Sequence, residues 1–412
     1  MFKALSEVEI SPQYKGFPLA GHGKSVARFL ESKPNLFTSD FQFPIMILKE
    51  SALSHNIERM AQYCKKLGVL LAPHVKTTMS AQLAQRQVDA GAWGITVANF
   101  AQANIFLDYG FKRIIIGNEV VEKTSICEIA RRNYLDNTEI IFYIDSLDGV
   151  KIASQAISDQ VHSKLHIFLE IGTDGGRAGI RDLSLLNKIL KEISKNPKFV
   201  IRGVSGFEGA VPDGGRKGKG ATNLRKFLAK IVKAAEIVAP YVGEDKLIIS
   251  AGGTSYFDYV VEEFKKYKGD AEIILRSGGY VSHDHIYYEN SNPFMKSKSK
   301  ERFVPALELW SRVLSIPESK LAILNFGKRD AGIDVDNPLP VKRFSKKLRP
   351  FKAVILSLND QHAFMKITKG SLDVGDVIAC GISHPCTSFD KWKLIPVVND
   401  NYDVVDCIHT FF

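Results

Sequence analysis

A single lysine stands in the stretch Leu71–Ser80, which reads LAPHVKTTMS. No aspartate, glutamate or arginine lies within nine positions of Lys76, and the apolar run Val69–Ala72 precedes it. Lysines are mostly exposed, usually among other charges on a solvated helix or loop. An isolated lysine after a buried strand is therefore either a side chain that extends to solvent or a reactive amine.

Two glycine-rich segments also follow short apolar runs. Ser250–Thr254 reads SAGGT, and Arg276–Tyr280 reads RSGGY. Backbone N–H groups in such loops can bind a phosphate, and the hydroxyls of Thr254 and Ser277 would lie nearby. Glycine pairs mark ordinary turns as well, so each loop by itself carries little information.

An arginine and a His-x-Cys triplet complete the set of residues that could do chemistry. Arg177 lies in Glu170–Gly179 (EIGTDGGRAG), where it could donate to an anionic oxygen or pair with Asp174. In Ser383–Thr387 (SHPCT), an extended backbone would direct His384 and Cys386 to the same face. Imidazole and thiolate are a good pair of zinc ligands, although a buried cysteine beside a structural histidine fits too. His283–His285 (HDH) is either a second ligand cluster or a hydrogen-bonded strand exit.

The elements that must position these residues alternate between strand and helix from residue 51 onward. Amphipathic helical patterns separate the apolar runs, as in Ser80–Ala90, Asn99–Tyr109, Lys123–Asn133 and Leu183–Ser194. Eight runs predict strands: Val69–Pro73, Gly94–Ala98, Ile114–Ile116, Ile140–Asp145, His166–Ile171, Ile201–Phe207, Leu247–Ser250 and Ile273–Leu275. Strand–helix alternation predicts parallel pairing, and this number of units predicts a (β/α)8 TIM-type barrel. A doubly wound sheet is the alternative, but no GxGxxG opens a helix after a first strand.

A second, mainly antiparallel β domain is predicted after about Tyr288, where helical periods fade. Its strands are expected at Leu307–Ser315, Leu321–Phe326, Lys352–Leu358, Ala363–Ile367, Val377–Cys380, Leu394–Val398 and Val404–Phe411. We therefore expect three parts: residues 1–50 joining the β domain through a strand at Pro44–Leu48, a barrel over 51–288, and the β domain over 289–412.

The positions of the reactive residues on this barrel indicate a cofactor. Active sites of (β/α)8 enzymes lie at the carboxyl ends of the strands, and phosphate is often bound after strands 7 and 8. Lys76 follows the first predicted strand, and the two glycine loops follow the seventh and eighth. A lysine opposite two phosphate loops predicts pyridoxal 5′-phosphate (PLP), which forms an imine with a lysine.

Composition narrows the class of protein. The net charge of +10 comes largely from clusters at residues 216–219, 296–302 and 342–352. We interpret these clusters as solvated loops. They do not predict a nucleic-acid site, because no nucleic-acid-binding motif accompanies them. The sequence contains no run of 18 apolar residues, so no membrane-spanning helix is predicted. The N-terminus lacks the apolar region of a signal peptide. The five cysteines are scattered and form no CxxC, so we expect a reducing cytoplasm and no disulfide framework.

Taken together, these segments resemble a known family, the fold-type III PLP enzymes of the D-threonine aldolase and D-serine dehydratase group. The likeness spans nearly the whole chain, and its elements are PHVKTTMS, GAWGITVAN, EIGTDGGRAGI, GFEGAV, SAGGTSYFD, ILRSGGYVSHD and SHPCTSFDKW. The last is the most specific, because an HPC or HPD triplet in the β domain is the metal site of that group. The resemblance implies an alanine-racemase-like barrel, a β domain and a homodimer.

Carried over by position, Lys76 resembles the lysine that forms the imine, His74 lies beside the cofactor, and Arg177 resembles the partner of its phenolic oxygen. The resemblance assigns the phosphate cradle to Gly252, Gly253, Thr254, Gly278, Gly279 and Tyr280, and a divalent metal, zinc, to His384 and Cys386. One departure is Phe207 in GFEG, where relatives commonly carry tyrosine.

The resemblance implies a lyase that acts on a small D-amino acid. Cysteine as the second metal ligand favours dehydration of a substrate such as D-serine to a 2-oxo acid and ammonia, and aspartate is more frequent in the aldolases. Retro-aldol cleavage to glycine and an aldehyde is the main alternative. A racemase would need a second base on the opposite face, and barrels that only bind PLP lack the β domain.

Overall fold

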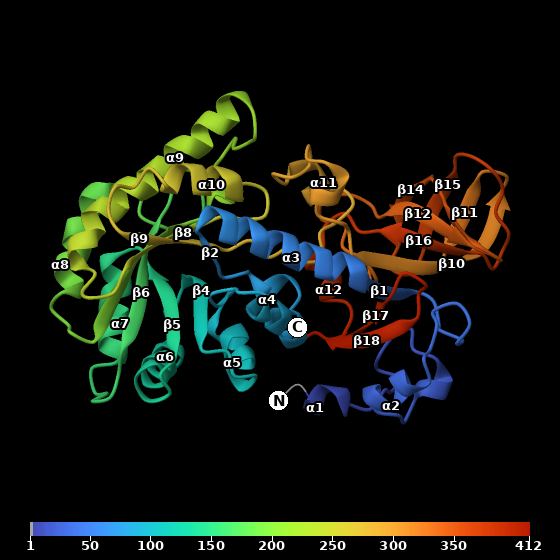
Figure 1. The fold of residues 1–412 in the computed structure, drawn as a ribbon, viewed down its shortest axis with the longest axis horizontal. Coiled ribbons are helices and arrows are strands. Elements are labelled where there is room, and N and C mark those ends of the chain that lie inside the picture. The colour runs from blue at the N-terminus through green and yellow to red at the C-terminus, as the bar shows by residue number, and fades with distance from the viewer. Residues whose placement is uncertain (1–2) are drawn as a thin grey trace. The chain divides into compact units, whose positions relative to one another are not determined.

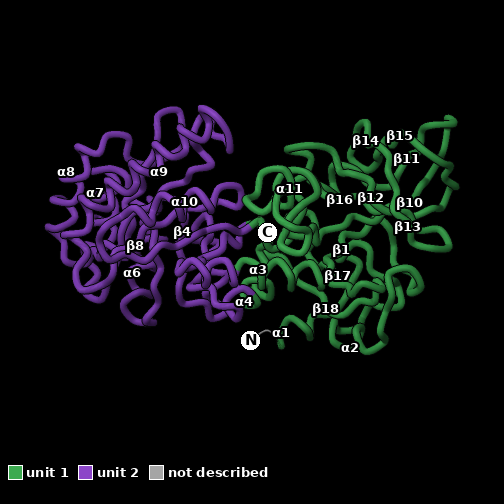
Figure 2. Tube along the Cα trace, turned by 45° about the horizontal axis from the view of Figure 1, so that its top comes forward, with its two compact units in different colours: residues 1–60, 77–86, 279–412 green, residues 61–76, 87–278 purple. Residues whose placement is uncertain are grey.

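The computed structural model describes residues 3–412. Two compact units divide the chain, and each contains more than one segment. One comprises residues 61–76 and 87–278, and the other comprises residues 1–60, 77–86 and 279–412; Figure 2 colours them separately. The chain passes from one unit to the other directly after Lys76 and directly after Gly278. The domain boundaries predicted at residues 50 and 288 stay a prediction.

Eight strands form one wholly parallel sheet in the first of these units, here called the barrel unit. Their spatial order is β2-β9-β8-β7-β6-β5-β4-β3. They are β2 (Leu70–Leu71), β3 (Ile95–Val97), β4 (Arg113–Glu119), β5 (Glu139–Ile144), β6 (Leu165–Ile171), β7 (Phe199–Gly206), β8 (Leu247–Ala251) and β9 (Ala271–Leu275). A parallel bridge between His74 and Thr96 joins the two ends of the sheet, which closes the barrel. All eight predicted strands are therefore present, and the (β/α)8 fold is confirmed.

Helices alternate with these strands along the chain (Figure 1). They are α3 (Glu50–Leu67), α4 (Ala81–Asp89), α5 (Phe100–Asp108), α6 (Lys123–Leu135), α7 (Leu147–Ala156), α8 (Leu186–Ile193), α9 (Gly218–Val238) and α10 (Phe257–Phe264). Helix α8 shows why they form, because its buried residues Leu186, Ile189, Leu190 and Ile193 recur at the spacing of one helical face. The interior of the barrel is filled by apolar side chains and one phenol, among them Ile115, Ile141, Tyr143, Phe168 and Ile248.

The other unit, here called the β unit, contains the remaining strands in a mainly antiparallel arrangement. They are β1 (Ile45–Lys49), β10 (Leu307–Glu318), β11 (Leu321–Leu324), β12 (Leu339–Phe344), β13 (Leu348–Pro350), β14 (Ala353–Leu358), β15 (Ala363–Ile367), β16 (Val377–Gly381), β17 (Leu394–Val398) and β18 (Val404–His409). Its short helices are α1 (Lys3–Ser6), α2 (Val26–Glu31), α11 (Tyr287–Ser291) and α12 (Cys386–Phe389).

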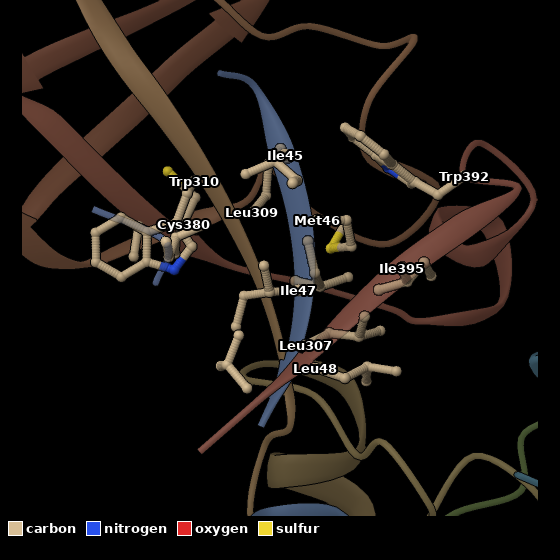
Figure 3. Close-up of a cluster of buried hydrophobic side chains, with 14 of the residues drawn as sticks. Ile45, Met46, Ile47, Leu48, Leu307, Leu309, Trp310, Cys380, Trp392 and Ile395 are labelled. Carbon is tan, nitrogen blue, oxygen red and sulfur yellow. The ribbon is translucent and has the colours of Figure 1, made fainter. Parts of the chain in front are cut away.

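Strand β1 lies at the centre of the β unit. It pairs antiparallel with β10 and parallel with β17, and all five of its residues are buried. Figure 3 shows Ile45 and Met46 of β1 among side chains such as Leu309, Trp310 and Ile395. A strand buried on both faces reads as a continuous apolar run, which is why residues 44–48 could be predicted as part of this sheet.

The hairpin of β12 and β13 was not predicted. It carries much of the basic cluster at residues 342–352, which we had interpreted as a solvated loop. The residues of β13 are exposed and those of β12 are mostly half-buried, so their sequence shows no apolar alternation. No helix in residues 3–412 has the length and apolar character needed to cross a membrane.

Candidate active site

Lys76 lies on a short 3-10 turn, Val75–Thr77, which begins three residues after the end of β2. The approach to this turn is held by backbone bonds, because Thr96 N–H donates to Pro73 O at 2.8 Å and His74 N–H donates to Arg276 O at 3.2 Å. The lysine is exposed, whereas Val75 and Thr77 on either side are buried. The structure therefore places the lysine at the carboxyl end of a barrel strand, where (β/α)8 enzymes have their reactive groups.

His74 presents a buried ring nitrogen without a hydrogen-bond partner, its Nδ1 atom. Burial lowers the pKa of His74 well below the ordinary range, and the nearby cations Lys76, Arg276 and Arg177 lower it further. The imidazole is therefore neutral near pH 7. Its backbone also explains the need for a glycine at position 278, since a Cβ there would lie 2.1 Å from His74 O.

Arg177 lies in the loop after β6, and a second arginine holds that loop. The guanidinium of Arg181 donates to Ala178 O and Gly179 O, both at 2.6 Å, and also to the carbonyls of Gly176 and Arg177. The exposed Arg177 guanidinium lies 5.0 Å from the ring centroid of Phe207. Among the described residues Arg177 forms no ion pair with Asp174, so it is available to a ligand.

The glycine loop after β8 already holds an anion of the chain itself. Gly252 N–H donates to Glu208 Oε2 at 3.0 Å, and Gly253 N–H donates to Glu208 Oε1 at 2.6 Å. Glu208 is 1% exposed and belongs to the GFEG segment. The side chain of Glu208 therefore occupies the backbone N–H groups of both glycines in this loop.

The second loop, after β9, is tightly packed. Gly278 belongs to the barrel unit, and Gly279 and Tyr280 belong to the β unit. A Cβ at Gly279 would lie 2.3 Å from the ring of Tyr288. Tyr280 is 1% exposed, and its ring lies 5.6 Å from that of Phe303, so it packs in an aromatic cluster.

Arg276 was not predicted as a site residue, yet it is a buried cation directly after β9, at the carboxyl end of the barrel strands, here called the barrel mouth. It donates to Ser205 Oγ at 2.9 Å, Ser250 Oγ at 2.7 Å and Gly206 O at 2.7 Å. Ser205 in turn donates to the phenol oxygen of Tyr143 at 2.9 Å. These bonds link strands β5, β7 and β8. In the sequence, the only sign of them is a serine near the end of the apolar runs that form β7 and β8.

Two carboxyl groups also meet in the barrel unit. Glu170 on β6 is 5% exposed, and the carboxyl group of Glu119, the last residue of β4, lies near enough to affect its pKa. Burial raises the pKa of Glu170 to about 9, and Glu119 raises it as well, whereas Arg276 and Arg177 oppose the shift. Glu170 is therefore protonated near pH 7.

The predicted metal ligands lie near each other in the β unit. Cys386 is close enough to His384 to raise the pKa of its imidazole, and Thr77 Oγ1 lies 3.4 Å from Cys386 Sγ. The expectation of an extended segment is wrong, because Pro385 is helical and Cys386 begins α12. The turn brings the two side chains together all the same. Burial would lower the pKa of His384, but Cys386 and Asp334 together raise it to about 9.

Asp334 was not predicted as a site residue, and its Oδ2 accepts a hydrogen bond from His384 Nδ1–H at 2.6 Å. Within residues 3–412 no group of three or more histidine, cysteine, aspartate or glutamate side chains is arranged to hold a metal ion. His384 and Cys386 carry an imidazole and a thiol, which are side chains of the types that bind zinc.

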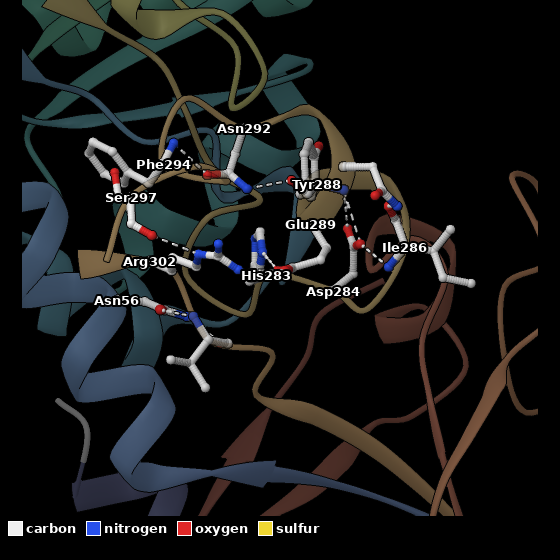
Figure 4. Close-up of polar contacts among 12 residues, drawn as sticks. Asn56, His283, Asp284, Ile286, Tyr288, Glu289, Asn292, Phe294, Ser297 and Arg302 are labelled. Atoms are coloured by element: carbon white, nitrogen blue, oxygen red, sulfur yellow. Dashed lines mark hydrogen bonds and ion pairs between the residues drawn. The ribbon is translucent and has the colours of Figure 1, made fainter. Parts of the chain in front are cut away.

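The HDH triplet has structural partners (Figure 4). His283 Nε2 lies 3.1 Å from Glu289 Oε2, and Asp284 Oδ1 accepts from Ile286 N–H and Tyr288 N–H at 2.9 and 3.0 Å. Of the two interpretations left open for this triplet, the described residues show the hydrogen bonding of His283 and Asp284, but in the segment before α11 (Tyr287–Ser291) and not at a strand exit, because β9 ends at Leu275.

Comparison with known proteins identifies the family. The chain matches the family models "Alanine racemase, N-terminal domain" over residues 48–244 and "Putative serine dehydratase domain" over residues 306–398. The chain belongs to the D-serine dehydratase and D-threonine aldolase group of fold-type III PLP enzymes.

Individual members of this group share the fold at low sequence identity. The chain is 24% identical to a 3-hydroxy-D-aspartate aldolase of Paracoccus denitrificans over 375 residues, which cover 90% of this chain and 92% of the relative. It superimposes on the D-threonine aldolase of Filomicrobium marinum with a TM-score of 0.76 at 20% identity, covering 90% and 95% of the two chains. The D-threo-3-hydroxyaspartate dehydratase of Delftia sp. HT23 gives a TM-score of 0.71 at 18% identity, with 90% and 97% covered. A mutant of a D-threo-3-hydroxyaspartate dehydratase with one cysteine changed to alanine also matches, in a metal-free form.

Proposed function

We propose that the protein is a PLP- and metal-dependent lyase that dehydrates a D-3-hydroxy amino acid, such as D-serine, to a 2-oxo acid and ammonia. The observation that carries the proposal is that His384 and Cys386 lie near each other in the β unit, an imidazole and a thiol of the kind that bind zinc. The lyase class is supported by relatives named as aldolases and a dehydratase of 3-hydroxy amino acids.

The residues of the barrel unit fit the cofactor. The unpartnered, buried Nδ1 of His74, the glycine required at position 278 and the unpaired guanidinium of Arg177 are features of a site built for an anionic aromatic ligand. PLP supplies an electron sink for the α-carbon of an amino substrate. In this proposal Lys76 holds PLP, Arg177 donates to its phenolic oxygen, and Thr254 contributes to the phosphate site.

Each protein group then has a defined task. The amine of Lys76, once released, accepts the α-proton from one face of the substrate, which selects the D isomer. His384 and Cys386 hold the metal, whose chemistry is Lewis acidity toward a hydroxyl oxygen. Hydroxide is a poor leaving group, so this assistance lies at the hardest step of dehydration.

Retro-aldol cleavage is the second candidate, and the names of two relatives favour it. It needs the same residues and differs in the bond that breaks. A base would remove the proton of the β-hydroxyl, and the Cα–Cβ bond would break to give glycine and an aldehyde. Cys386 is the residue that favours dehydration over this route.

A substrate panel tests the choice. The purified protein with PLP and zinc is incubated with D-serine, D-threonine and 3-hydroxy-D-aspartate, and with their L isomers as controls. We expect a 2-oxo acid and ammonia from at least one D isomer. Glycine and an aldehyde as the only products would overturn dehydration in favour of the aldolase.

Two pairs of variants test the residues. We expect Lys76→Ala to lose the visible absorbance of bound PLP and the activity, and Lys66→Ala, an exposed lysine at the end of α3, to keep both. A wild-type protein that stays colourless with added PLP would refute the proposal. His162 is an exposed histidine, so EDTA should abolish the activity of the His162→Ala variant and added zinc should restore it. Added zinc should not restore activity in His384→Ala.

A further inference from the structure

The loop at residues 327–336 is attached to the His-x-Cys turn by several contacts. Gly332 N–H donates to Ser388 Oγ at 3.0 Å, and Ser388 Oγ donates to His384 O at 3.2 Å. Trp392 Nε1–H donates to Asp330 O at 2.8 Å. A Cβ at Gly332 would lie 2.2 Å from Thr387 Oγ1, so the two segments pack at backbone distance.

This attachment places one carboxylate of the loop on the metal-site histidine. Asp334 Oδ2 lies 2.6 Å from His384 Nδ1, and Asp334 Oδ1 accepts from the hydroxyl of Thr387 at 2.6 Å. Both oxygens are therefore engaged by the turn that carries Cys386. The side chains of His384 and Asp334 are 18% and 39% exposed.

A carboxylate on one ring nitrogen decides what the other nitrogen can do. It holds a proton at Nδ1, so Nε2 is the nitrogen at which a metal ion would bind, and it fixes the plane of the ring. The two nitrogens point in diverging directions, so a carboxylate that bonds Nδ1 does not bind the same metal ion as Nε2.

We propose that Asp334 is a positioning residue that orients His384 so that Nε2 and Cys386 Sγ bind the metal together. This inference rests on the metal site of the proposed function. Thr387 acts with Asp334, because it restrains the carboxylate that restrains the imidazole. Nothing in the sequence indicated this role, since Asp334 precedes His384 by 50 positions.

The test measures metal affinity and does not depend on turnover. The dissociation constant for Zn²⁺ is determined by competition with a chelating dye for the metal-free wild type, Asp334→Ala and Asp334→Asn. Asp336→Asn is the matched control, because this exposed residue on the same loop bonds only its neighbour Asn337, at 2.7 Å. The absorption spectrum of bound Co²⁺ reports whether Cys386 remains a ligand.

We expect Asp334→Ala to weaken Zn²⁺ binding about 10- to 100-fold, as loss of a carboxylate on a metal-bound histidine does elsewhere. Asp334→Asn keeps an acceptor for Nδ1–H and should lose less, and Asp336→Asn should bind as the wild type does. Thermal unfolding of the metal-free proteins should be unchanged.

Two results would overturn the inference: Zn²⁺ binding by Asp334→Ala with wild-type affinity, or a loss of metal-free stability without a change in the affinity of the folded protein. A different result would overturn the metal site of the proposed function, namely a wild type that binds Zn²⁺ no better than His384→Ala. The two failures are thus distinguishable.

Discussion

The proton that Glu170 retains in the folded protein makes the stability of the barrel unit depend on pH in an unusual direction. In the folded protein the pKa of Glu170 is raised to about 9, mainly by burial and then by Glu119. In the unfolded chain the same carboxyl titrates near ~4.3. Between these values the folded state holds a proton that the unfolded state releases, so the free energy of unfolding falls as pH rises.

The size of the effect follows from this difference. Each pH unit in the window costs about 1.4 kcal/mol, so the interval from pH 6 to pH 8 costs up to about 3 kcal/mol. The contribution is complete below the unfolded pKa and disappears as pH rises through about 9. Glu170→Gln keeps a hydrogen-bond donor toward Glu119 and cannot ionise, so it should remove this slope and be more stable than the wild type at pH 8.

The assay is urea unfolding of the protein without PLP and metal at several pH values, followed by a probe in the barrel unit, because two units can unfold separately. Glu244→Gln, at an exposed position of the same unit, is the control and should follow the wild type. The difference in unfolding free energy between Glu170→Gln and the wild type should grow with pH. A difference that stays constant from pH 6 to pH 8 would refute the raised pKa of Glu170.

Two further predictions concern the backbone of the barrel mouth. Gly278→Ala would place a Cβ 2.1 Å from His74 O and should destabilise the barrel unit by about 1–3 kcal/mol or more in urea unfolding, whereas Gly243→Ala, with nothing within 4 Å, should be neutral. Arg181→Met would free several carbonyls of the loop that carries Arg177. Faster hydrogen exchange in residues 172–181 and weaker PLP binding are expected, and unchanged exchange would contradict the role of Arg181.

The strands of both units could be predicted because their sequences are determined by burial. The run Ile114–Ile116 is apolar at each position, since a strand of a parallel barrel is covered on both faces. The hairpin β12–β13 escaped prediction for the opposite reason. Its exposed and half-buried residues, many of them basic, leave no apolar period in the sequence.

The sequence by itself also determined where the reactive residues stand on the fold. Lys76, Arg177 and the glycine loops follow predicted strands, and the carboxyl ends of parallel strands lie at one end of a barrel. The His-x-Cys spacing was local as well, although the turn that joins the two residues is helical and not extended.

Only the tertiary structure decided which groups support these residues. The carboxylate of Glu208 reaches Gly252 across 44 positions, and Asp334 reaches His384 across 50. Arg276 bonds serines of two other strands. A glutamate or an aspartate in a polar loop looks like any solvated residue, because its partner is chosen by packing between segments far apart in the chain. The candidate site residues were therefore visible in the sequence, and the residues that bond to the segments around them became visible only in the fold.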